Sequence, residues 1–172
     1  MLVLLEGVDG SGKTTLARKL FEKGYCCKRV FRYDNHEARK FYGYAYRDGI
    51  VVLDRSFISD YVYRQTDMQP REDLDLEQIG NILNGDVVII HCVNQNHYED
   101  AMERGEDNIT DKDTSDWIAS LYYDAMRVFS TFTNAKIFAY DYHNTTVDEV
   151  DKFIKEVYDE FKKDDSEEHS LE

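Results

Sequence analysis

The chain has 172 residues, of which 42% are hydrophobic, and this size and composition suit a single globular domain with a sizeable core. Its net charge of −14 argues against a nucleic-acid polymer as partner, because binding a phosphate backbone requires clustered lysine and arginine. The three cysteines have no metal-ligand spacing and cannot build a disulfide framework, and no apolar run approaches the ~20 residues of a membrane span. We therefore expect a cytoplasmic protein with reduced thiols, without a signal peptide and without a membrane partner.

The first predicted elements frame a glycine-rich turn. An apolar run over residues 2–5 predicts a buried strand, and residues 15–21 predict a helix with one apolar face. Between them, residues 7–14 read G-V-D-G-S-G-K-T and match the pattern G-x-x-x-x-G-K-[ST] at every fixed position. The backbone N–H groups of such a turn, together with the positive end of the helix dipole, form an anion site.

This turn predicts the binding of a nucleoside triphosphate. Lys13 is expected to reach the β- and γ-phosphates, and the Thr14 hydroxyl is expected to hold Mg²⁺. The residues that we expect to surround the triphosphate are Gly7, Val8, Asp9, Gly10, Ser11, Gly12, Lys13, Thr14 and Thr15. A plain glycine- and serine-rich turn is the alternative, but the strand–turn–helix order favours a phosphate-binding loop.

The rest of the chain alternates between predicted strands and helices. Strands are predicted over residues 28–32, 50–53, 86–92 and 135–140. Helices are predicted over residues 35–46, 57–65, 74–83, 98–104 and 114–132, followed by a last helix with an apolar face over residues 147–161. Thr145 or Thr146 caps that helix, and Glu149 completes a capping box with Thr146. The alternation predicts a parallel sheet with helices on both faces.

One domain is expected over residues 1–163. Residues 164–172 are polar and mostly acidic, and we expect them to form a disordered tail. Leu171 and Glu172 match the start of a vector-encoded tag and are excluded from the fold prediction. The five histidines have no metal-ligand spacing, so the sequence predicts no metal site besides that for Mg²⁺.

A charged pair follows the predicted strand 50–53. Because the carboxyl ends of parallel strands meet at one edge of the sheet, Asp54 and Arg55 should face the glycine-rich turn across a crevice. An arginine there can clamp a phosphate or stabilise charge on a transferred group. A carboxylate there can hold the Mg²⁺ shell or orient an attacking hydroxyl. The alternative is a surface ion pair that only ends a strand.

Two segments resemble known P-loop kinases. Residues 6–15, E-G-V-D-G-S-G-K-T-T, resemble the opening of thymidylate kinases, and Asp54-Arg55 followed by Ser59 and Tyr63 resembles their D-R-x-x-x-S-x-x-x-Y segment. The second segment also resembles the E-R-S segment of deoxynucleoside kinases. The resemblance implies a three-layer α/β sandwich with a five-stranded parallel sheet, ATP as phosphoryl donor, Mg²⁺ as cofactor and a homodimeric assembly.

The two families differ in their acceptors. In thymidylate kinases an acidic residue at the position of Asp9 contacts the sugar of the acceptor monophosphate, and the arginine matching Arg55 helps to bind phosphates. Deoxynucleoside kinases usually carry glutamate at the position of Asp54, so Asp9 and the pair Asp54-Arg55 both favour a deoxynucleoside monophosphate, of pyrimidine type. Ser56 and the pair Ser59-Asp60 lean toward deoxynucleoside kinases, whose carboxylate at the position of Asp54 is the base on the acceptor hydroxyl.

The chain also departs from the thymidylate kinase pattern. It has no R-x-P-G-G segment, and Arg64 stands where those kinases usually carry a glutamine that reads the base. The sequence therefore does not select the base. Three arginines are candidates for holding the acceptor phosphate: Arg32, Arg39 and Arg47.

Residues 104–113 are polar and charged, and related kinases place a mobile lid at this point of the chain. Closure of a lid excludes water and brings a cation to the transferring phosphoryl group. Thymidylate kinases with glycine at the position of Gly10 generally supply that cation from the lid, which implies Arg104 first and Lys112 second. An ordinary solvated loop is the alternative.

The sequence thus predicts a kinase that transfers the γ-phosphoryl group of ATP·Mg²⁺ to a deoxynucleoside monophosphate. A deoxynucleoside kinase and a non-catalytic nucleotide-binding regulatory protein are the alternatives. The expected catalytic residues are Lys13, Asp54, Arg55 and Arg104, and the expected metal ligands are Thr14 and Asp54. The acceptor is expected to contact Asp9, Arg55, Phe57 and Tyr61, although aromatic residues on a helix often pack in the core instead.

Overall fold

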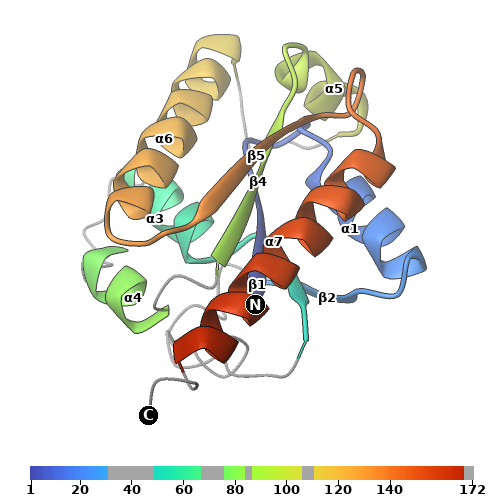
Figure 1. Ribbon diagram of the computed structural model, residues 1–172. Coiled ribbons are helices and arrows are strands. Elements are labelled where there is room, and N and C mark those ends of the chain that lie inside the picture. The colour runs from blue at the N-terminus through green and yellow to red at the C-terminus, as the bar shows by residue number, and fades with distance from the viewer. Residues whose placement is uncertain (31–48, 67–75, 84–86, 106–110, 169–172) are drawn as a thin grey trace.

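The computed structural model describes residues 1–30, 49–66, 76–83, 87–105 and 111–168. Strands and helices alternate along these residues (Figure 1). The strands are β1 (Leu2–Glu6), β2 (Cys26–Arg29), β3 (Val51–Asp54), β4 (Val87–Val93) and β5 (Lys136–Asp141). The helices are α1 (Lys13–Glu22), α3 (Phe57–Thr66), α4 (Leu76–Leu83), α5 (His97–Glu103), α6 (Lys112–Thr131) and α7 (Val147–Glu168).

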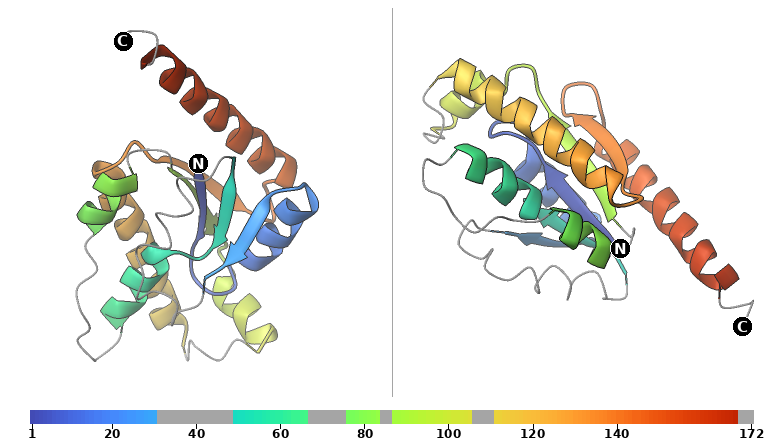
Figure 2. Two further views of the ribbon diagram at one scale, coloured as in Figure 1. Left: turned by 90° about the horizontal axis from the view of Figure 1, so that it is seen from below. Right: turned by 90° about the vertical axis from the view of Figure 1, so that its left-hand side faces the viewer.

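The strands form one parallel five-stranded sheet with the order β2-β3-β1-β4-β5. Helices α1 and α7 cover one face, and α3, α4 and α6 cover the other, as the views in Figure 2 show. The predicted fold class, a three-layer α/β sandwich with a parallel sheet, is confirmed. In such a sheet the carboxyl ends of all strands lie at the same edge, which is where loops carry binding sites.

Burial follows the position of each strand in the sheet. The central strands β1, β3 and β4 are covered on both faces, which explains their nearly continuous runs of leucine, isoleucine and valine. The outer strands β2 and β5 are largely exposed and carry Lys28 and Lys136. Charged side chains on edge strands discourage pairing with further chains.

Two helix starts are set by local hydrogen bonds. The Asp111 side chain accepts from Thr114 N at 2.8 Å, so α6 begins at Lys112, slightly before the predicted residue 114. The predicted capping box of α7 is confirmed, since Glu149 N donates to Thr146 Oγ1 at 3.2 Å and Glu149 accepts from Thr146 N at 2.7 Å.

Several predicted boundaries differ from the structure. Strand β2 occupies Cys26–Arg29, where residues 28–32 were predicted. Helix α7 continues to Glu168, so residues 164–168 are helical where we expected a disordered tail. The predicted helix 35–46 and residues 169–172 lie outside the described residues. No helix in the described part of the chain is long and apolar enough to cross a membrane.

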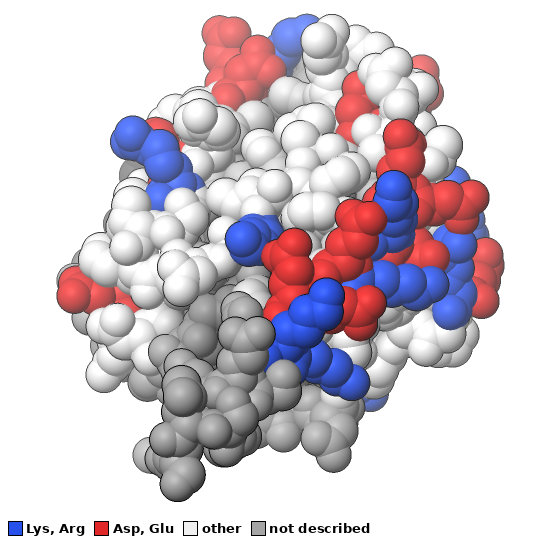
Figure 3. Space-filling view, in the orientation of Figure 1, with Lys and Arg blue, Asp and Glu red and all other residues white. Residues whose placement is uncertain are grey.

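Charged side chains of both signs are interspersed over α1 and α7 on the face shown in Figure 3. Lys23 pairs with Asp148 across these two helices at 2.6 Å, and Lys155 pairs with Asp151 along α7 at 2.9 Å. Such exposed pairs contribute little to stability, at most about 1 kcal/mol each. They leave the two apolar cores of the sandwich as the main source of the folding free energy.

Candidate active site

The glycine-rich turn joins β1 to α1 and wraps around the start of the helix. Gly10 and Gly12 have φ angles of 80° and 85°, in the left-handed region that favours glycine. A side chain at Gly10 would collide with the carbonyl oxygen of His97, and one at Gly12 would lie 2.9 Å from the ring of Tyr142. The turn therefore keeps its shape only with glycine at these positions, and its backbone amides remain available to an anion.

Lys13 is buried beneath this turn. Its Nζ donates to the carbonyl oxygen of Val8 at 2.7 Å and to Ser11 Oγ at 3.3 Å. Burial, together with the nearby charge of Arg55, lowers the pKa of Lys13 to about 8. A lysine held in this way gains a favourable partner when negative phosphate groups enter the turn.

Thr14 and Asp54 meet at the mouth of the crevice. Thr14 Oγ1 donates to Asp54 Oδ2 at 2.9 Å, although the two residues are 40 positions apart. Two adjacent oxygen ligands of an octahedral Mg²⁺, each at ~2.1 Å from the ion, lie about 3 Å apart. The hydroxyl and the carboxylate therefore fit a Mg²⁺ site in both chemistry and spacing. Among the described residues there is no cluster of three or more His, Cys, Asp or Glu that could hold a metal.

Arg55 lies beside the turn and is held from three sides. One guanidinium nitrogen pairs with Asp9, another donates to the Tyr122 hydroxyl at 3.2 Å, and the guanidinium carbon lies 5.5 Å from the centre of the Tyr63 ring. Asp9 also accepts from the Tyr63 hydroxyl at 3.1 Å. Burial opposes ionisation of Asp9, but the charges of Arg55 and Lys13 outweigh it and hold the pKa of Asp9 below its ordinary value.

A buried carboxylate, Glu6, lies behind Arg55 at the end of β1. It accepts hydrogen bonds from the hydroxyls of Ser56 and Ser59, the latter at 2.6 Å. Burial raises the pKa of Glu6, while these two hydroxyls and the charge of Arg55 act against that rise. The sequence patterns do not predict a functional role for Glu6 or Tyr122. The i, i+3 spacing of the two serines at the start of a helix that follows a charged pair was the available signal.

A second polar cluster ties the turn to the other side of the sheet edge. Asn94 Nδ2 donates to Gly10 O at 3.3 Å, to Asp100 Oδ2 at 2.7 Å and to the Tyr142 hydroxyl at 3.0 Å. The Tyr142 hydroxyl also donates to Asp100. This cluster fastens the turn to β4, to α5 and to the segment between β5 and α7.

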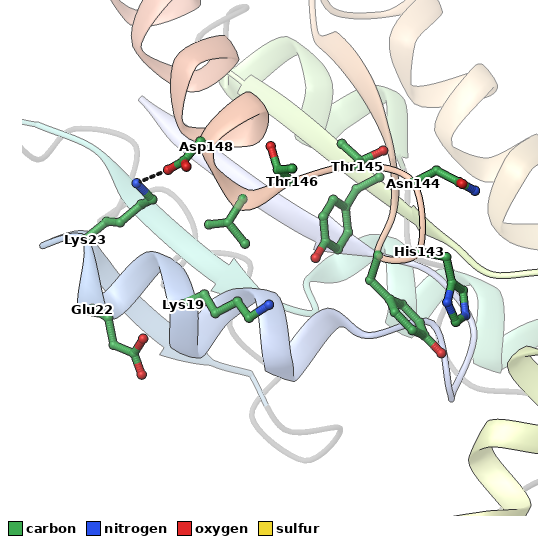
Figure 4. A pocket seen from close by; sticks show the side chains of 11 residues that line it. Lys19, Glu22, Lys23, His143, Asn144, Thr145, Thr146 and Asp148 are labelled. Atoms are coloured by element: carbon green, nitrogen blue, oxygen red, sulfur yellow. Dashed lines mark ion pairs between the residues drawn. The ribbon is translucent and has the colours of Figure 1, made fainter.

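The segment between β5 and α7 borders an open pocket next to α1 (Figure 4). Lys19 and Lys23 approach it from α1, and His143, Asn144 and Thr145 approach it from the opposite side. The pocket is adjacent to the glycine-rich turn, because Tyr142 lines the pocket and also contacts Gly12. It is polar, solvent-facing and unlike the enclosed network around Arg55.

The predicted lid residues are only partly described. Arg104 directly follows α5, and its charge acts on Asp100 and Tyr142. The pKa of Asp100 is lowered, mainly by the hydrogen bond from Tyr142, whereas burial raises the pKa of Tyr142 to about 12. Lys112 is the first residue of α6 and pairs with Glu99 at 2.9 Å. Residues 106–110 lie outside the described residues, as do Arg32, Arg39 and Arg47. The structure thus brings Arg104 close to the second polar cluster, whereas Lys112 is engaged at the surface.

The two aromatic residues expected at the acceptor have different positions. Phe57 is 1% exposed and packs against Phe129, with ring centres 5.1 Å apart. It belongs to the core under α6, which favours the core-packing alternative for Phe57 over the expected contact with the acceptor. Tyr61 is half-buried and packs against the same core.

Solved structures share this fold. YorR protein from Bacillus subtilis, in complex with phosphorylated GDP, has a TM-score of 0.69 and 24% identity, over 92% of this chain and 96% of that chain. Deoxyadenosine kinase from M. mycoides, with the products dCMP and dCDP bound, has a TM-score of 0.58 and 13% identity, over 94% of this chain and 100% of that one. The same enzyme with bound dCTP has a TM-score of 0.57 and 14% identity, over 95% and 100% of the two chains.

No protein-family model matches the sequence, and no curated protein matches it. The likeness to the solved structures is therefore one of fold, over nearly the whole length of each chain. The protein therefore shares its α/β fold with YorR protein and with deoxyadenosine kinase.

Proposed function

We propose that this protein is a kinase that transfers the γ-phosphoryl group of ATP·Mg²⁺ to a deoxynucleoside monophosphate. The observation that carries the proposal is the meeting of the two motifs across the crevice. Thr14 of the first motif contacts Asp54 of the second at 2.9 Å, and Asp9 of the first pairs with Arg55 of the second. A site that only binds a triphosphate does not require charged side chains opposite the glycine-rich turn, whereas phosphoryl transfer requires groups on both sides of the transferred phosphate.

The roles of the donor-side residues follow from their chemistry. The amides of the turn and the Lys13 ammonium bind the β- and γ-phosphates. Thr14 and Asp54 hold Mg²⁺, which neutralises phosphate charge when it is bound. Arg55 stabilises the charge that develops on the transferred group, and Arg104 joins it from the lid. Positioning and charge neutralisation supply most of the rate in such transfers.

The orientation of Asp9 supports a monophosphate acceptor. Its carboxylate turns away from the turn amides toward Arg55 and Tyr63, so it faces the acceptor side of the crevice. In this position it can accept from a sugar hydroxyl, while the adjacent guanidinium attracts a phosphate. Phosphorylated GDP in YorR and dCMP with dCDP in deoxyadenosine kinase are nucleotides bound by the same fold.

A deoxynucleoside acceptor is the second candidate. Asp54 is buried at the end of β3, and it could take the proton of a 5′-hydroxyl instead of serving the metal. The two neighbouring structures of deoxyadenosine kinase favour this candidate. A third candidate is a regulatory protein that binds ATP without transferring its phosphate.

A substrate panel separates the three candidates. Purified protein is supplied with ATP·Mg²⁺ and, separately, each of the four deoxynucleosides and each of the four deoxynucleoside monophosphates, and ADP formation is followed. We expect turnover with at least one monophosphate and none with nucleosides. Turnover with nucleosides alone would replace our proposal by the second candidate. ATP binding without turnover of any acceptor would support the third.

A further inference from the structure

A directed chain of hydrogen bonds runs from the Arg55 guanidinium to Glu6. Arg55 Nη1 donates to the Tyr122 hydroxyl oxygen at 3.2 Å, and that oxygen lies 2.8 Å from Ser59 Oγ. Ser59 Oγ donates its hydrogen to Glu6 Oε2 at 2.6 Å. Because a serine hydroxyl has one hydrogen, the Tyr122 hydroxyl must donate to Ser59 and accept from Arg55. Every bond therefore points the same way, from the cation to the carboxylate.

The four groups of this hydrogen-bond chain come from three elements and from the segment between β3 and α3. Glu6 ends β1, Arg55 follows β3, Ser59 lies in α3 and Tyr122 lies in α6. Glu6, Ser59 and Tyr122 are buried, with Tyr122 at 0% exposure, so water does not compete for these bonds. Bonds aligned in one direction polarise one another, which strengthens the last of them.

Arg55 requires an external hold because its backbone conformation is unfavourable. Its φ angle of 70° lies in the left-handed region that non-glycine residues rarely adopt. Such a conformation persists only when surrounding contacts maintain it. Asp9 holds one nitrogen of the guanidinium from the glycine-rich turn, and Tyr122 holds another from α6. Without the Tyr122 contact, the guanidinium is held only by Asp9 and by the ring of Tyr63.

We infer that Tyr122 is a positioning residue that aims Arg55 at the transferring phosphoryl group, with Ser59 and Glu6 supporting Tyr122 from behind. The kinetic consequence of this inference rests on the proposed kinase function.

The principal test is Tyr122→Phe, which removes the hydroxyl and keeps the ring. Hydrogen bonds to charged groups are worth enough that we expect kcat to fall roughly tenfold to a hundredfold. The Kd for ATP, measured directly, should stay within about twofold, because Lys13 and the turn amides are unchanged. Ser59→Ala removes the next hydrogen bond, between Tyr122 and Ser59, and should lower kcat by a smaller factor.

A double-mutant cycle separates positioning from a general structural effect. In an Arg55→Lys background the guanidinium is absent, so Tyr122→Phe should cause no further loss of kcat. Tyr25→Phe is the matched control, since it removes a tyrosine hydroxyl that donates to Asp151 at 2.7 Å on the other face of the sheet. This control should keep the wild-type kcat even where its melting temperature falls as much as that of Tyr122→Phe.

A second readout does not depend on catalysis. The arginine side-chain N–H signals of the protein are recorded by NMR, and the Arg55 signal is identified by its loss in Arg55→Lys. Faster guanidinium rotation in Tyr122→Phe than in Tyr25→Phe supports the inference. Unchanged rotation, or losses of kcat that multiply in the double mutant, overturns it. Absence of turnover in the wild type would overturn the proposed function, and the NMR comparison would still decide whether Tyr122 holds Arg55.

Discussion

The two faces of the sheet are built from the same strands but serve different purposes. Along β1, Val3 and Leu5 point toward α1 and α7 and belong to the apolar core on that face of the sheet. Leu2 and Leu4 point toward α3 and α6, but the next residue on that side is Glu6, which opens the buried polar network. The face under α1 and α7 therefore contributes mainly to the stability of the fold. The face under α3 and α6 has an apolar core as well, but at the carboxyl edge of the sheet it carries the buried polar network.

This difference shows how a small domain can contain a buried polar network that by itself would destabilise the fold. Buried charges destabilise a fold unless they are paired, and here the network is confined to one edge of one face. The opposite face, with Leu16, Leu20, Val150 and Ile154 all at 0% exposure, contributes apolar burial without such a cost. Substitutions on each face, measured separately for activity and for unfolding free energy, can show which of the two properties each face affects more.

The largest effect is expected for Lys13→Met. Loss of the ammonium should reduce kcat/KM about 10²–10³-fold, because a preorganised donor to the phosphates is removed. The unfolding free energy should rise by about 1–3 kcal/mol, since a buried charge is replaced by an apolar side chain of similar length. Enzyme assays and denaturant unfolding check the two values. Near wild-type activity would show that the glycine-rich turn is not the donor site.

The second prediction concerns the opposite face. Ile154→Ala removes a fully buried side chain between α7 and the sheet and should lower the unfolding free energy by about 2–5 kcal/mol. At a temperature where the variant is folded, kcat/KM should equal that of the wild type. Ile154→Val, a milder change at the same site, should cost about 0.5–1.5 kcal/mol. A large loss of activity in either folded variant would contradict the proposal that this face affects stability more than activity.

The third prediction is a pH dependence. Burial holds the pKa of Lys13 at about 8 in the free protein, and bound phosphates should raise it again. ATP binding at pH 8 should therefore take up roughly half a proton, and at pH 6 almost none. Calorimetry in two buffers of different ionisation enthalpy measures this uptake. The same uptake in Lys13→Met would assign it to another group.

The depressed pKa of Lys13 also predicts the sign of a stability change. The group releases its proton near pH 8 when folded and near 10.5 when unfolded, so the unfolded chain binds more protons between these values. The contribution of Lys13 to the unfolding free energy should rise as pH increases through this window. The difference in unfolding free energy between Lys13→Met and the wild type should therefore shrink from pH 7 to pH 10.

The smallest effect is expected for Phe57→Leu, a change on the functional face but away from its polar edge. Because Phe57 packs on Phe129 in the core, the unfolding free energy should fall by about 1 kcal/mol. The KM for the acceptor should not change. Tyr61→Phe provides the comparison on the same helix. A selective rise of the acceptor KM in Phe57→Leu would return this residue to the acceptor site.

Local patterns were enough to predict the strands, most helices and the glycine-rich turn. The turn occupies contiguous residues 7–14, and its conformation depends on glycines within that stretch. The start of α7 was predictable for the same reason, since Thr146 and Glu149 bond to each other within one helical turn. Where these local predictions differ from the structure, they differ in the ends of an element. Helix α7, for example, continues to Glu168.

The meeting of strand ends at one edge of a parallel sheet was enough to predict that Asp54 and Arg55 face the glycine-rich turn, but their individual partners and the burial of Phe57 required the folded structure. Asp54 and Arg55 meet Thr14 and Asp9 because β3 pairs with β1 in register, a contact that no local pattern encodes. Phe57, two residues beyond Arg55, points into the core instead.

The partners of Arg55 show most clearly what local sequence patterns cannot predict. Tyr122 lies 67 positions from Arg55, and no local pattern in α6 indicates a hydrogen bond to a charged group. The amino-acid sequence alone thus determined a fold class and a phosphate-binding turn, because those depend on neighbours along the chain. The geometry of the crevice depends on how the sheet brings distant segments together, and that required the folded structure.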